Sequence, residues 1–417
     1  MKALVLAGGF PQIALIEELK QRGIQTVLAD WNENPVARKY ADKYYRASTL
    51  DEAKIEEIAV DEAVDFIITV CTDQALLTVA KVSEKLGLPC YIDYQTALNV
   101  TNKSYMKEIF VKNDVPTAKH IIAGSLNEEA IEHMNFPLIV KPVDCNSSKG
   151  VRRVENIEEL RQAFDDAVAM SRTDSAIVEE FITGKELSAD FYISNGKAEL
   201  LSVSESCKIK DKDKFVIFRA LYPSIASHKL EAEIQDVGQK IADAFGITDS
   251  PMLVQMLVDN GRLNVIEFSA RTGGGVKYLL IKHISGFDVI KAVVDLTLGV
   301  KPEYTGKKSA VNYLVNDFIY CKPGVFDHLD GFEELKAEGI LKDYYQFKWQ
   351  GAEFDSVCNS GDRVSGYTVV GETADELIEK HKKVLEKIRV IDNEGNDIAR
   401  HDLLTDITEE NGFIFSN

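Results

Sequence analysis

Short apolar runs alternate with helical patterns over the first hundred residues, and this alternation constrains the fold more than any other feature of the chain. Three runs are predicted to be strands: ALVLA (3–7), TVLAD (26–30) and FIITV (66–70). Helices are predicted after Gly8-Gly9, over 51–59 and over 73–86. Because strands that alternate with helices build parallel sheets, we expect an α/β fold that begins with a Rossmann-like domain over residues 1–100.

The pattern changes after residue 100. A predicted helix over NKSYMKEIFVKNDV is followed by apolar runs that lie close together in the chain. The turns Ser194-Asn195-Gly196 and Asp259-Asn260-Gly261 have the length and residue types of β-hairpins, so their strands are predicted to be antiparallel. We expect a central domain over 101–305 and a C-terminal α+β lobe over 306–417, with a long helix at 373–388.

The charge balance argues against a polyanionic partner. Lys and Arg number 48 against 67 Asp and Glu, which gives a formal net charge of −19. Such an excess of negative charge repels phosphate backbones and anionic membranes at long range, although a small phosphate ligand can still bind in a local basic pocket. We therefore expect small-molecule partners, no nucleic acid and no membrane, and we leave a homodimer open.

Cysteine usage and the amino terminus both predict a cytoplasmic protein. The six cysteines are scattered singly without a CxxC motif, which favours free thiols in a reducing compartment. The short apolar run in MKALVLAGGFP is predicted to be a first strand rather than a signal peptide. No apolar run approaches the ~20 residues of a membrane span.

The glycines after the first strand, with Asp30 at the end of the second, are similar to a dinucleotide-binding fold. However, Phe10, Pro11 and Gln12 follow Gly8-Gly9, so the GxGxxG fingerprint is absent. No GxxxxGK[ST] phosphate loop occurs either. We expect a Rossmann-like domain that does not bind a nicotinamide cofactor.

VIEFSARTGGG, residues 265–275, places charge at a strand end before a loop that has almost no side chains. Glu267 could lie beside Gln255 across the preceding hairpin, and oxygen ligands of this kind suit Mg²⁺. Arg271 just beyond could meet the charge of a transferring phosphoryl group. A hairpin end with a surface ion pair explains the stretch equally well when it is taken alone.

Two other strands carry charges that are costly to bury without a partner. Lys141 lies in PLIVKP, and the loop Ser147-Ser148-Lys149-Gly150 offers hydroxyls and backbone N–H groups that suit phosphate oxygens. In AIVEEFITGKE, an apolar strand ends in two acids, and its backbone could face a purine edge. A surface lysine and a solvated strand end are the plainer alternatives.

Taken together, the motifs resemble the ATP-grasp superfamily. They occur in the family's order: Lys103, Lys141, SSKGV, VEEFI, Glu186, Gln255, Glu267 and Arg271. Their spacing is similar to the branch that contains biotin carboxylase, carbamoyl phosphate synthetase and the L-amino-acid ligases. The resemblance covers about residues 1–300, and the last hundred residues resemble the family's variable C-terminal lobe only loosely.

The resemblance implies ATP and Mg²⁺ (or Mn²⁺), with a role for each matching residue. The implied ATP-binding residues are Lys103, Lys141, Ser147, Ser148, Gly150, Glu179, Glu180, Phe181, Ile182 and Glu186. The implied metal ligands are Gln255, Glu267 and Ser269, although the family usually has Asn at the last position, which puts the second metal in doubt. Arg271 and Lys141 would be catalytic, and Gly273, Gly274 and Gly275 would make room for the acceptor substrate.

The reaction implied by the resemblance is attack of a carboxylate on the ATP γ-phosphate, followed by displacement of phosphate by an amine. An ADP-forming carboxylate–amine ligase, for example one that joins amino acids, is the expected function. A carboxylase, a carbamoyl-phosphate-type kinase and a non-catalytic ATP-binding module are the alternatives. The chain has no biotin-carrier segment such as MKM and no duplicated half.

One basic segment has two interpretations. CKIKDKDK, residues 207–214, carries four lysines in a chain that is otherwise strongly acidic. It is either the solvated tip of a hairpin or a mobile lid that attracts an anion. In the lid interpretation, Arg219 on the following strand would pair with a substrate carboxylate.

Overall fold

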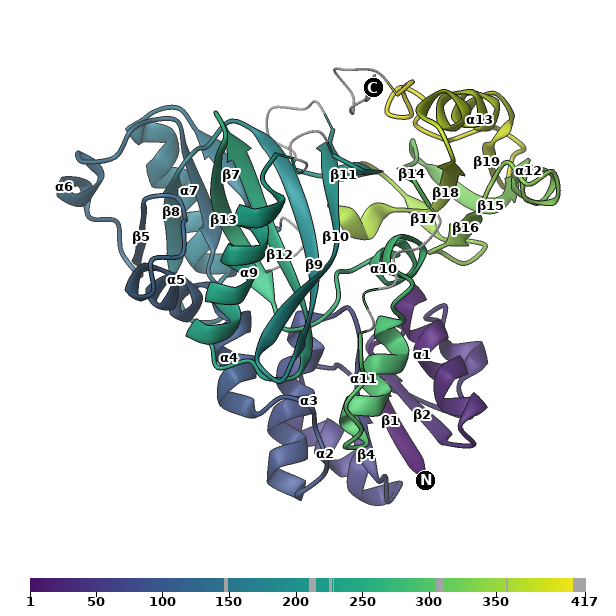
Figure 1. Cartoon of the computed structure of the whole chain (residues 1–417), viewed down its shortest axis with the longest axis horizontal. Coiled ribbons are helices and arrows are strands. Elements are labelled where there is room, and N and C mark those ends of the chain that lie inside the picture. Colours follow the sequence, from purple (N-terminus) through teal and green to yellow (C-terminus); the bar gives the residue numbers. More distant parts are fainter. Residues whose placement is uncertain are drawn as a thin grey trace.

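The N-terminal residues form a parallel α/β domain, as the alternation predicts (Figure 1). The computed structural model describes residues 1–145, 149–209, 215–224, 227, 229–304, 306, 311–357 and 359–407. The strand order is β3-β2-β1-β4, with bounds β1 (Lys2–Leu6), β2 (Gln25–Asp30), β3 (Lys43–Arg46) and β4 (Phe66–Ile68). The helical elements of this domain are α1 (Phe10–Gln21), η1 (Arg38–Tyr40), α2 (Glu52–Asp61) and α3 (Asp73–Leu86).

Asp30, the acid that would bind ribose in a dinucleotide-binding fold, accepts hydrogen bonds from nearby backbone groups, including the loop after β1. Asp30 Oδ2 accepts a hydrogen bond from the Gly8 N–H at 2.6 Å, and its Oδ1 accepts one from the Asn32 N–H at 2.7 Å. A Cβ atom at Gly8 would lie 2.5 Å from Pro35 Cβ, so the glycine is required for close packing of the loop. Both sequence features that are similar to a dinucleotide site therefore have a structural role within this loop.

The central part of the chain builds two antiparallel sheets. The smaller sheet has the order β5-β8-β6-β7, with β5 (His120–Ala123), β6 (Leu138–Pro142), β7 (Arg152–Val154) and β8 (Ala176–Glu180). Helix α7 (Ile157–Met170) packs on this sheet, and the short α6 (Glu128–Ile131) lies at its edge. In Figure 1 this unit forms the left side of the molecule.

The larger sheet has eight strands in the order β13-β12-β9-β10-β11-β14-β18-β16. Its first five strands are β9 (Lys185–Ser194), β10 (Lys197–Lys208), β11 (Ile217–Tyr222), β12 (Ser250–Asp259) and β13 (Arg262–Ser269). The two predicted hairpin turns are confirmed, because Asn195, Gly196, Asn260 and Gly261 all have positive φ between 48° and 79°.

Helices pack on both faces of this sheet, since Phe191 and Tyr192, which are neighbours on β9, belong to two different hydrophobic cores. The helices of this part are α4 (Tyr94–Thr101), α5 (Lys103–Lys112), α9 (Glu231–Ala244), α10 (Lys277–Ser285) and α11 (Val289–Thr297). Asn102 caps α5, since its side chain accepts from the Ser104 N–H at 2.8 Å. The sequence pattern did not predict α4 or α10. Helix α10 begins just after the three glycines, and α10 and α11 share a core with the N-terminal domain.

The C-terminal segment both continues the large sheet and forms a separate sheet of three strands. Strands β14 (Tyr313–Ile319), β16 (Asp343–Gln346) and β18 (Ser365–Gly371) complete the eight strands. The remaining elements are β15 (Gly324–Asp330), α12 (Phe332–Ala337), β17 (Glu353–Phe354), η2 (Ser360–Asp362), α13 (Ala374–Lys387) and β19 (Arg389–Asp392). The predicted long helix is confirmed as α13, while the limits at residues 100 and 305 stay predictions.

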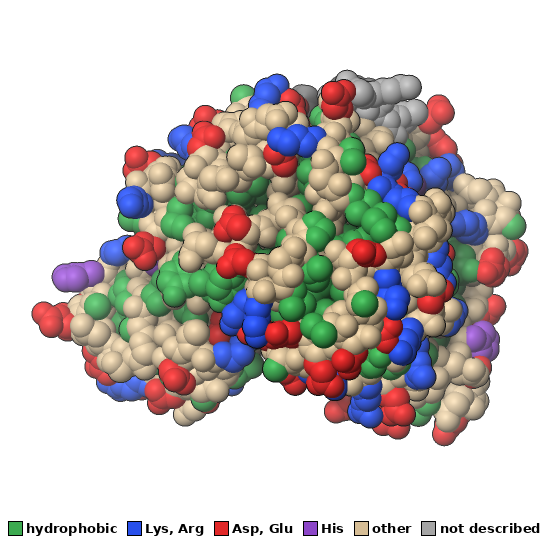
Figure 2. Space-filling view, turned by 90° about the horizontal axis from the view of Figure 1, so that it is seen from below, with side chains coloured by type: hydrophobic (Ala, Val, Ile, Leu, Met, Phe, Trp, Pro, Cys, Tyr) green, Lys and Arg blue, Asp and Glu red, His purple; other side chains and the backbone are tan. Residues whose placement is uncertain are grey.

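Figure 2 shows the face seen from below, where Lys and Arg side chains are interspersed with Asp and Glu. Over the described part of the chain, no helix is both long enough and apolar enough to cross a membrane. Five of the six cysteines lie in this part, and all five are free thiols.

Candidate active site

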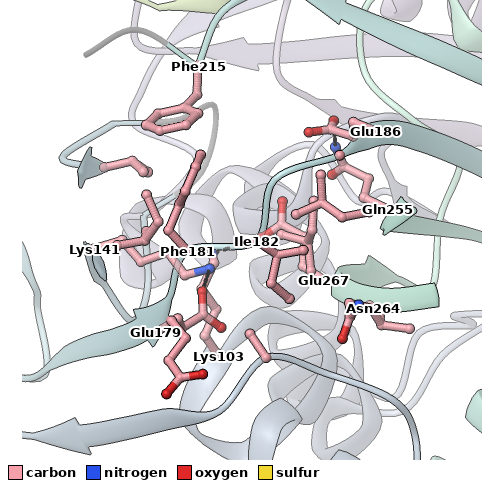
Figure 3. A pocket seen from close by; sticks show the side chains of 18 of the residues that line it. Lys103, Lys141, Glu179, Phe181, Ile182, Glu186, Phe215, Gln255, Asn264 and Glu267 are labelled. Atoms are coloured by element: carbon pink, nitrogen blue, oxygen red, sulfur yellow. Dashed lines mark hydrogen bonds and ion pairs between the residues drawn. The ribbon is translucent and has the colours of Figure 1, made fainter. Parts of the chain in front are cut away.

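A cavity of about 380 Å³ lies between the small and the large sheet (Figure 3). Its volume is within the ~300–1,000 Å³ that small-molecule sites occupy. Lys141 and Glu179 reach it from the small sheet, Phe181 reaches it from the connection between β8 and β9, and Glu186 and Gln255 reach it from the large sheet. Nine of the motif residues, spread over 165 positions of the sequence, therefore line one cavity: Lys103, Lys141, Glu179, Glu180, Phe181, Ile182, Glu186, Gln255 and Glu267.

One side of the cavity is apolar and suits a flat aromatic base. Its lining includes Ile139, Val151, Phe181, Ile182, Phe215, Ile217 and Leu257. The rings of Phe181 and Phe215 lie 6.5 Å apart, and the Arg153 guanidinium lies 4.4 Å from the Phe181 ring centre. The carboxylate of Glu180 points away toward Asn135, whose backbone N–H donates to it at 3.0 Å. A base would therefore contact the backbone of Phe181 and Ile182, which follow β8, and not the Glu180 side chain.

The opposite side of the cavity is rich in charge. Lys103 begins helix α5, and its Nζ lies 3.2 Å from Glu267 Oε2 and donates to the Cys145 carbonyl at 2.8 Å. Burial alone would lower the pKa of Lys103, but Glu267 raises it above its ordinary value. Burial alone would raise the pKa of Glu267, but Lys103 and then Lys141 lower it. Both groups are therefore charged at neutral pH and can exchange their pairing for phosphate and metal.

Lys141, on β6, forms an ion pair with Glu179 on β8. The strand pairing explains the contact, since Lys141 pairs with Ile177 and Glu179 lies two residues further along β8. The other Glu179 oxygen lies 2.7 Å from the ammonium of Lys107, a residue that the motif analysis missed. Its position one turn after Lys103 on the same helix was the available signal.

Gln255 and Glu267 are direct cross-strand partners on β12 and β13, as the hairpin predicted. The Gln255 amide nitrogen donates to Glu186 Oε1 at 3.2 Å, so its amide oxygen is the atom that can meet a cation. The other Glu186 oxygen contacts the ammonium of Lys208. Among the described residues, no group of three or more His, Cys, Asp or Glu side chains could hold a metal.

This donor set fits Mg²⁺ bound together with a nucleotide. Mg²⁺ is commonly held by one or two protein oxygens and completed by phosphates and water. Gln255 and Glu267 supply such oxygens at the charged side of the cavity. Mn²⁺ accepts the same oxygen ligands. The ligand role of Ser269 stays a prediction, because its hydroxyl donates to Asp73 at 2.7 Å.

Arg271 is held by an acid from the N-terminal domain. Its Nε donates to Asp73 Oδ1 at 2.7 Å, and its Nη2 contacts Asp73 Oδ2. Burial alone would raise the pKa of Asp73, but the Arg271 guanidinium lowers it below its ordinary value. The motif analysis missed Asp73, although it follows β4 at the carboxyl edge of the parallel sheet, where α/β proteins place functional residues.

The three glycines form a close-packed loop between the large sheet and the N-terminal domain. Gly275 has φ of +67°, and a Cβ atom there would lie 3.2 Å from Arg363 Nη1. A Cβ at Gly273 would lie 2.8 Å from Lys277 Cγ, whereas at Gly274 the closest atom would be the Cys71 carbonyl oxygen at 3.8 Å. The loop therefore brings backbone close to the β4–α3 loop that carries Asp73.

The position of Arg219 is not compatible with its predicted role as a substrate-binding residue. Its side chain is fully buried and pairs with Asp317 on the neighbouring strand β14, at 2.6 Å from Nε and 2.7 Å from Nη2. Because both partners lie inside the C-terminal core, Arg219 cannot meet a substrate in this structure. Gly150, by contrast, lies beside Pro142 near the end of β6.

Five other predicted positions cannot be placed. Ser147, Ser148 and the lysines at 210, 212 and 214 lie outside the described residues. Lys208, the first lysine of the basic segment, does line the cavity, and its ammonium lies 5.2 Å from the Phe215 ring centre. The choice between a solvated tip and a lid therefore stays open.

Comparison with known proteins identifies the segment that supplies most of the residues lining this cavity. Residues 134–278 match the family model described as "ATP-grasp domain". The chain contains an ATP-grasp domain. The resemblance to the ATP-grasp superfamily, inferred from the order of the motifs, is thereby confirmed, and so is the mixed α/β fold.

Relatives and solved structures extend the ATP-grasp similarity over most of the chain. The formate-dependent phosphoribosylglycinamide formyltransferase of Methanocaldococcus jannaschii is 24% identical over 330 residues, which are 76% of this chain and 82% of the relative. The L-amino acid ligase of Bacillus licheniformis superposes with a TM-score of 0.78 at 21% identity, covering 94% of this chain and 98% of that one.

A third match is the biotin carboxylase domain of the Hydrogenobacter thermophilus 2-oxoglutarate carboxylase. It has a TM-score of 0.79 at 18% identity and covers 97% of this chain and 92% of that chain. That structure was solved with MgADP, ADP and bicarbonate. At these identities, the property shared with the solved structures is the ATP-grasp fold.

Proposed function

We propose that this protein is an ATP-dependent, ADP-forming carboxylate–amine ligase that acts through an acylphosphate. One observation carries the proposal: Lys103 and Lys141, which can bind phosphates, line the same cavity as the cross-strand oxygen donors Gln255 and Glu267. The nucleotide would lie with its base against Phe181 and Ile182 and its phosphates toward the two lysines.

The protein groups supply position and charge instead of a nucleophile. Lys103 and Lys141 would neutralise phosphate oxygens, and Arg271, held in place by Asp73, would meet the γ-phosphoryl group as a carboxylate attacks it. Bound Mg²⁺, held by Gln255 and Glu267, would neutralise further phosphate charge during transfer. The amine then displaces phosphate from the acylphosphate, which yields an amide, ADP and inorganic phosphate.

The glycine loop supports an amino-acid-sized acceptor. Gly273, Gly274 and Gly275 follow Arg271 directly, so a carboxylate near the arginine would face backbone N–H groups instead of side chains. The fold-level similarity to an L-amino acid ligase agrees with this arrangement. The carboxylate and the amine could therefore both come from amino acids.

The test is ATP-dependent phosphate release over a panel of carboxylates, each with and without amines, with products identified by mass spectrometry. Product formation that needs both a carboxylate and an amine supports the ligase. ADP formation with bicarbonate and no amine would instead support a carboxylase or carbamoyl-phosphate-type kinase, the alternative favoured by the biotin carboxylase neighbour. ATP binding without turnover on any member of the panel would contradict the proposal.

A further inference from the structure

Lys107 is a buried cation beside the cavity, on the helix that also carries Lys103. The exposed fraction of its side chain is 1%, and that of Glu179, its partner, is 8%. Lys107 Nζ lies 2.7 Å from Glu179 Oε1, contacts the Thr117 hydroxyl and lies 3.5 Å from the Val265 carbonyl. Lys141 takes the other carboxylate oxygen of Glu179. One buried carboxylate thus stands between two ammonium groups.

The pKa of Glu179 depends on both Lys107 and Lys141. Burial alone would raise the pKa of Glu179, but Lys107 and Lys141 lower it well below its ordinary value. Burial lowers the pKa of Lys107, and the Lys141 charge acts in the same direction against the attraction of Glu179. A buried carboxylate that loses its only partner is strongly destabilised, whereas one that keeps a second partner is not.

We infer that Lys107 is a positioning residue for the nucleotide, because it keeps Glu179 paired while Lys141 turns to the phosphates. The inference rests on the proposed function, since it takes Lys141 as a phosphate ligand. Without Lys107, movement of Lys141 to a phosphate would leave the Glu179 carboxylate buried without its cation. Lys141 would then stay with Glu179, and the nucleotide would bind without it.

Lys103 offers an informative contrast. Its partner Glu267 also loses an ammonium group when Lys103 turns to a phosphate, but Glu267 is placed to gain Mg²⁺ in exchange. Glu179 lies on the small sheet, and its ion pairs within the described part of the chain are with Lys107 and Lys141. Lys107 would therefore compensate the charge of the Glu179 carboxylate, as the metal would compensate the charge of Glu267.

The test is calorimetric binding of ATP, ADP and adenosine to the full chain and to Lys107→Met. We expect the variant to bind ATP and ADP about tenfold or more weakly, while adenosine, which has no phosphate, binds within about twofold of the original chain. The double variant Lys107→Met/Glu179→Gln should regain most of the lost affinity, because a neutral amide needs no counter-ion. Lys112→Met, which changes an exposed lysine on the same helix, is the matched control.

Unchanged ADP affinity in Lys107→Met would overturn the inference. A parallel loss of adenosine and ADP binding without recovery in the double variant would also overturn it, since that result indicates a structural role. If Lys107→Met does not fold, Glu179→Gln alone decides: tighter ADP binding supports the inference, and unchanged or weaker binding contradicts it. Failure of the original chain to bind ATP would remove the proposed function itself, which is a different result.

Discussion

Replacing Arg219 by Met should destabilise the protein strongly and leave substrate binding unaffected. Arg219 and Asp317 are both fully buried, and they form a bidentate ion pair across β11 and β14. Asp317 also accepts from Tyr367 at 2.9 Å and lies 2.8 Å from His381 Nε2. Removal of the guanidinium leaves the buried carboxylate with these two weaker partners among the residues that the structure describes.

The expected size follows from the burial of the pair. Breaking a buried ion pair by removing one partner costs about 3–5 kcal/mol. At roughly 2–4 °C per kcal/mol for a domain of 150–250 residues, the Tm of the unit that contains the large sheet should fall by about 6–20 °C. The double variant Arg219→Met/Asp317→Leu should recover much of this loss, since it removes both charges together.

The pH dependence has a defined sign. Burial alone would raise the pKa of Asp317, but Arg219 and His381 lower it well below its ordinary value. A carboxyl group whose pKa is lower in the folded state stabilises the fold above its unfolded pKa of about 3.9, and this contribution disappears as the pH falls below that value. In Arg219→Met the main lowering cause is gone, so acid unfolding should begin at a higher pH than in the original chain.

The assay is thermal unfolding by calorimetry from pH 3 to pH 8, with steady-state kinetics on the same samples. An unchanged Tm together with a raised KM for the carboxylate substrate would refute this reasoning and restore Arg219 as a substrate-binding residue. A lowered Tm with unchanged KM below the unfolding temperature is the expected result.

Three further substitutions test the site itself. Lys141→Met should lower ATP turnover by about 100-fold or more, with the Tm within a few degrees of the original, as measured by phosphate release and calorimetry. Asp73→Asn should lower kcat by about 10–100-fold while the KM for ATP stays within about threefold, because Asp73 orients Arg271 and does not line the nucleotide cavity. A matching rise in the KM for ATP would contradict that role. Ser269→Asn should retain or raise activity at limiting Mg²⁺, since the amide can donate to Asp73 and still offer an oxygen; a complete loss with intact folding would assign Ser269 another role.

Much of the local structure could be predicted from the sequence. The alternation of apolar runs and helices over the first hundred residues predicted the parallel sheet, and the Asn-Gly turns predicted the hairpins β9–β10 and β12–β13. The pairing of Gln255 with Glu267 followed from the second hairpin. These features depend on residue periodicity and on backbone dihedral preferences, which neighbouring residues carry themselves.

The order of the motifs in the sequence was also sufficient to indicate the ATP-grasp domain. The sequence pattern nevertheless missed α10, and it did not show that three strands within residues 306–417 extend the large sheet. A strand at a sheet edge can pair with any other strand of the chain, and the local sequence does not indicate which one. The continuation of the large sheet was therefore visible only in the tertiary structure.

The partner of each buried charge was likewise decided by the tertiary structure. Arg219 and Arg271 look alike in the sequence, since each follows an apolar residue. Yet Arg219 pairs with Asp317, 98 residues away, inside the C-terminal core. Arg271 pairs with Asp73, 198 residues away, beside the glycine loop. The role of a buried charged side chain depends on the group that compensates its charge. The packing of elements that are distant in the sequence brings that group close, so the neighbouring sequence does not reveal it.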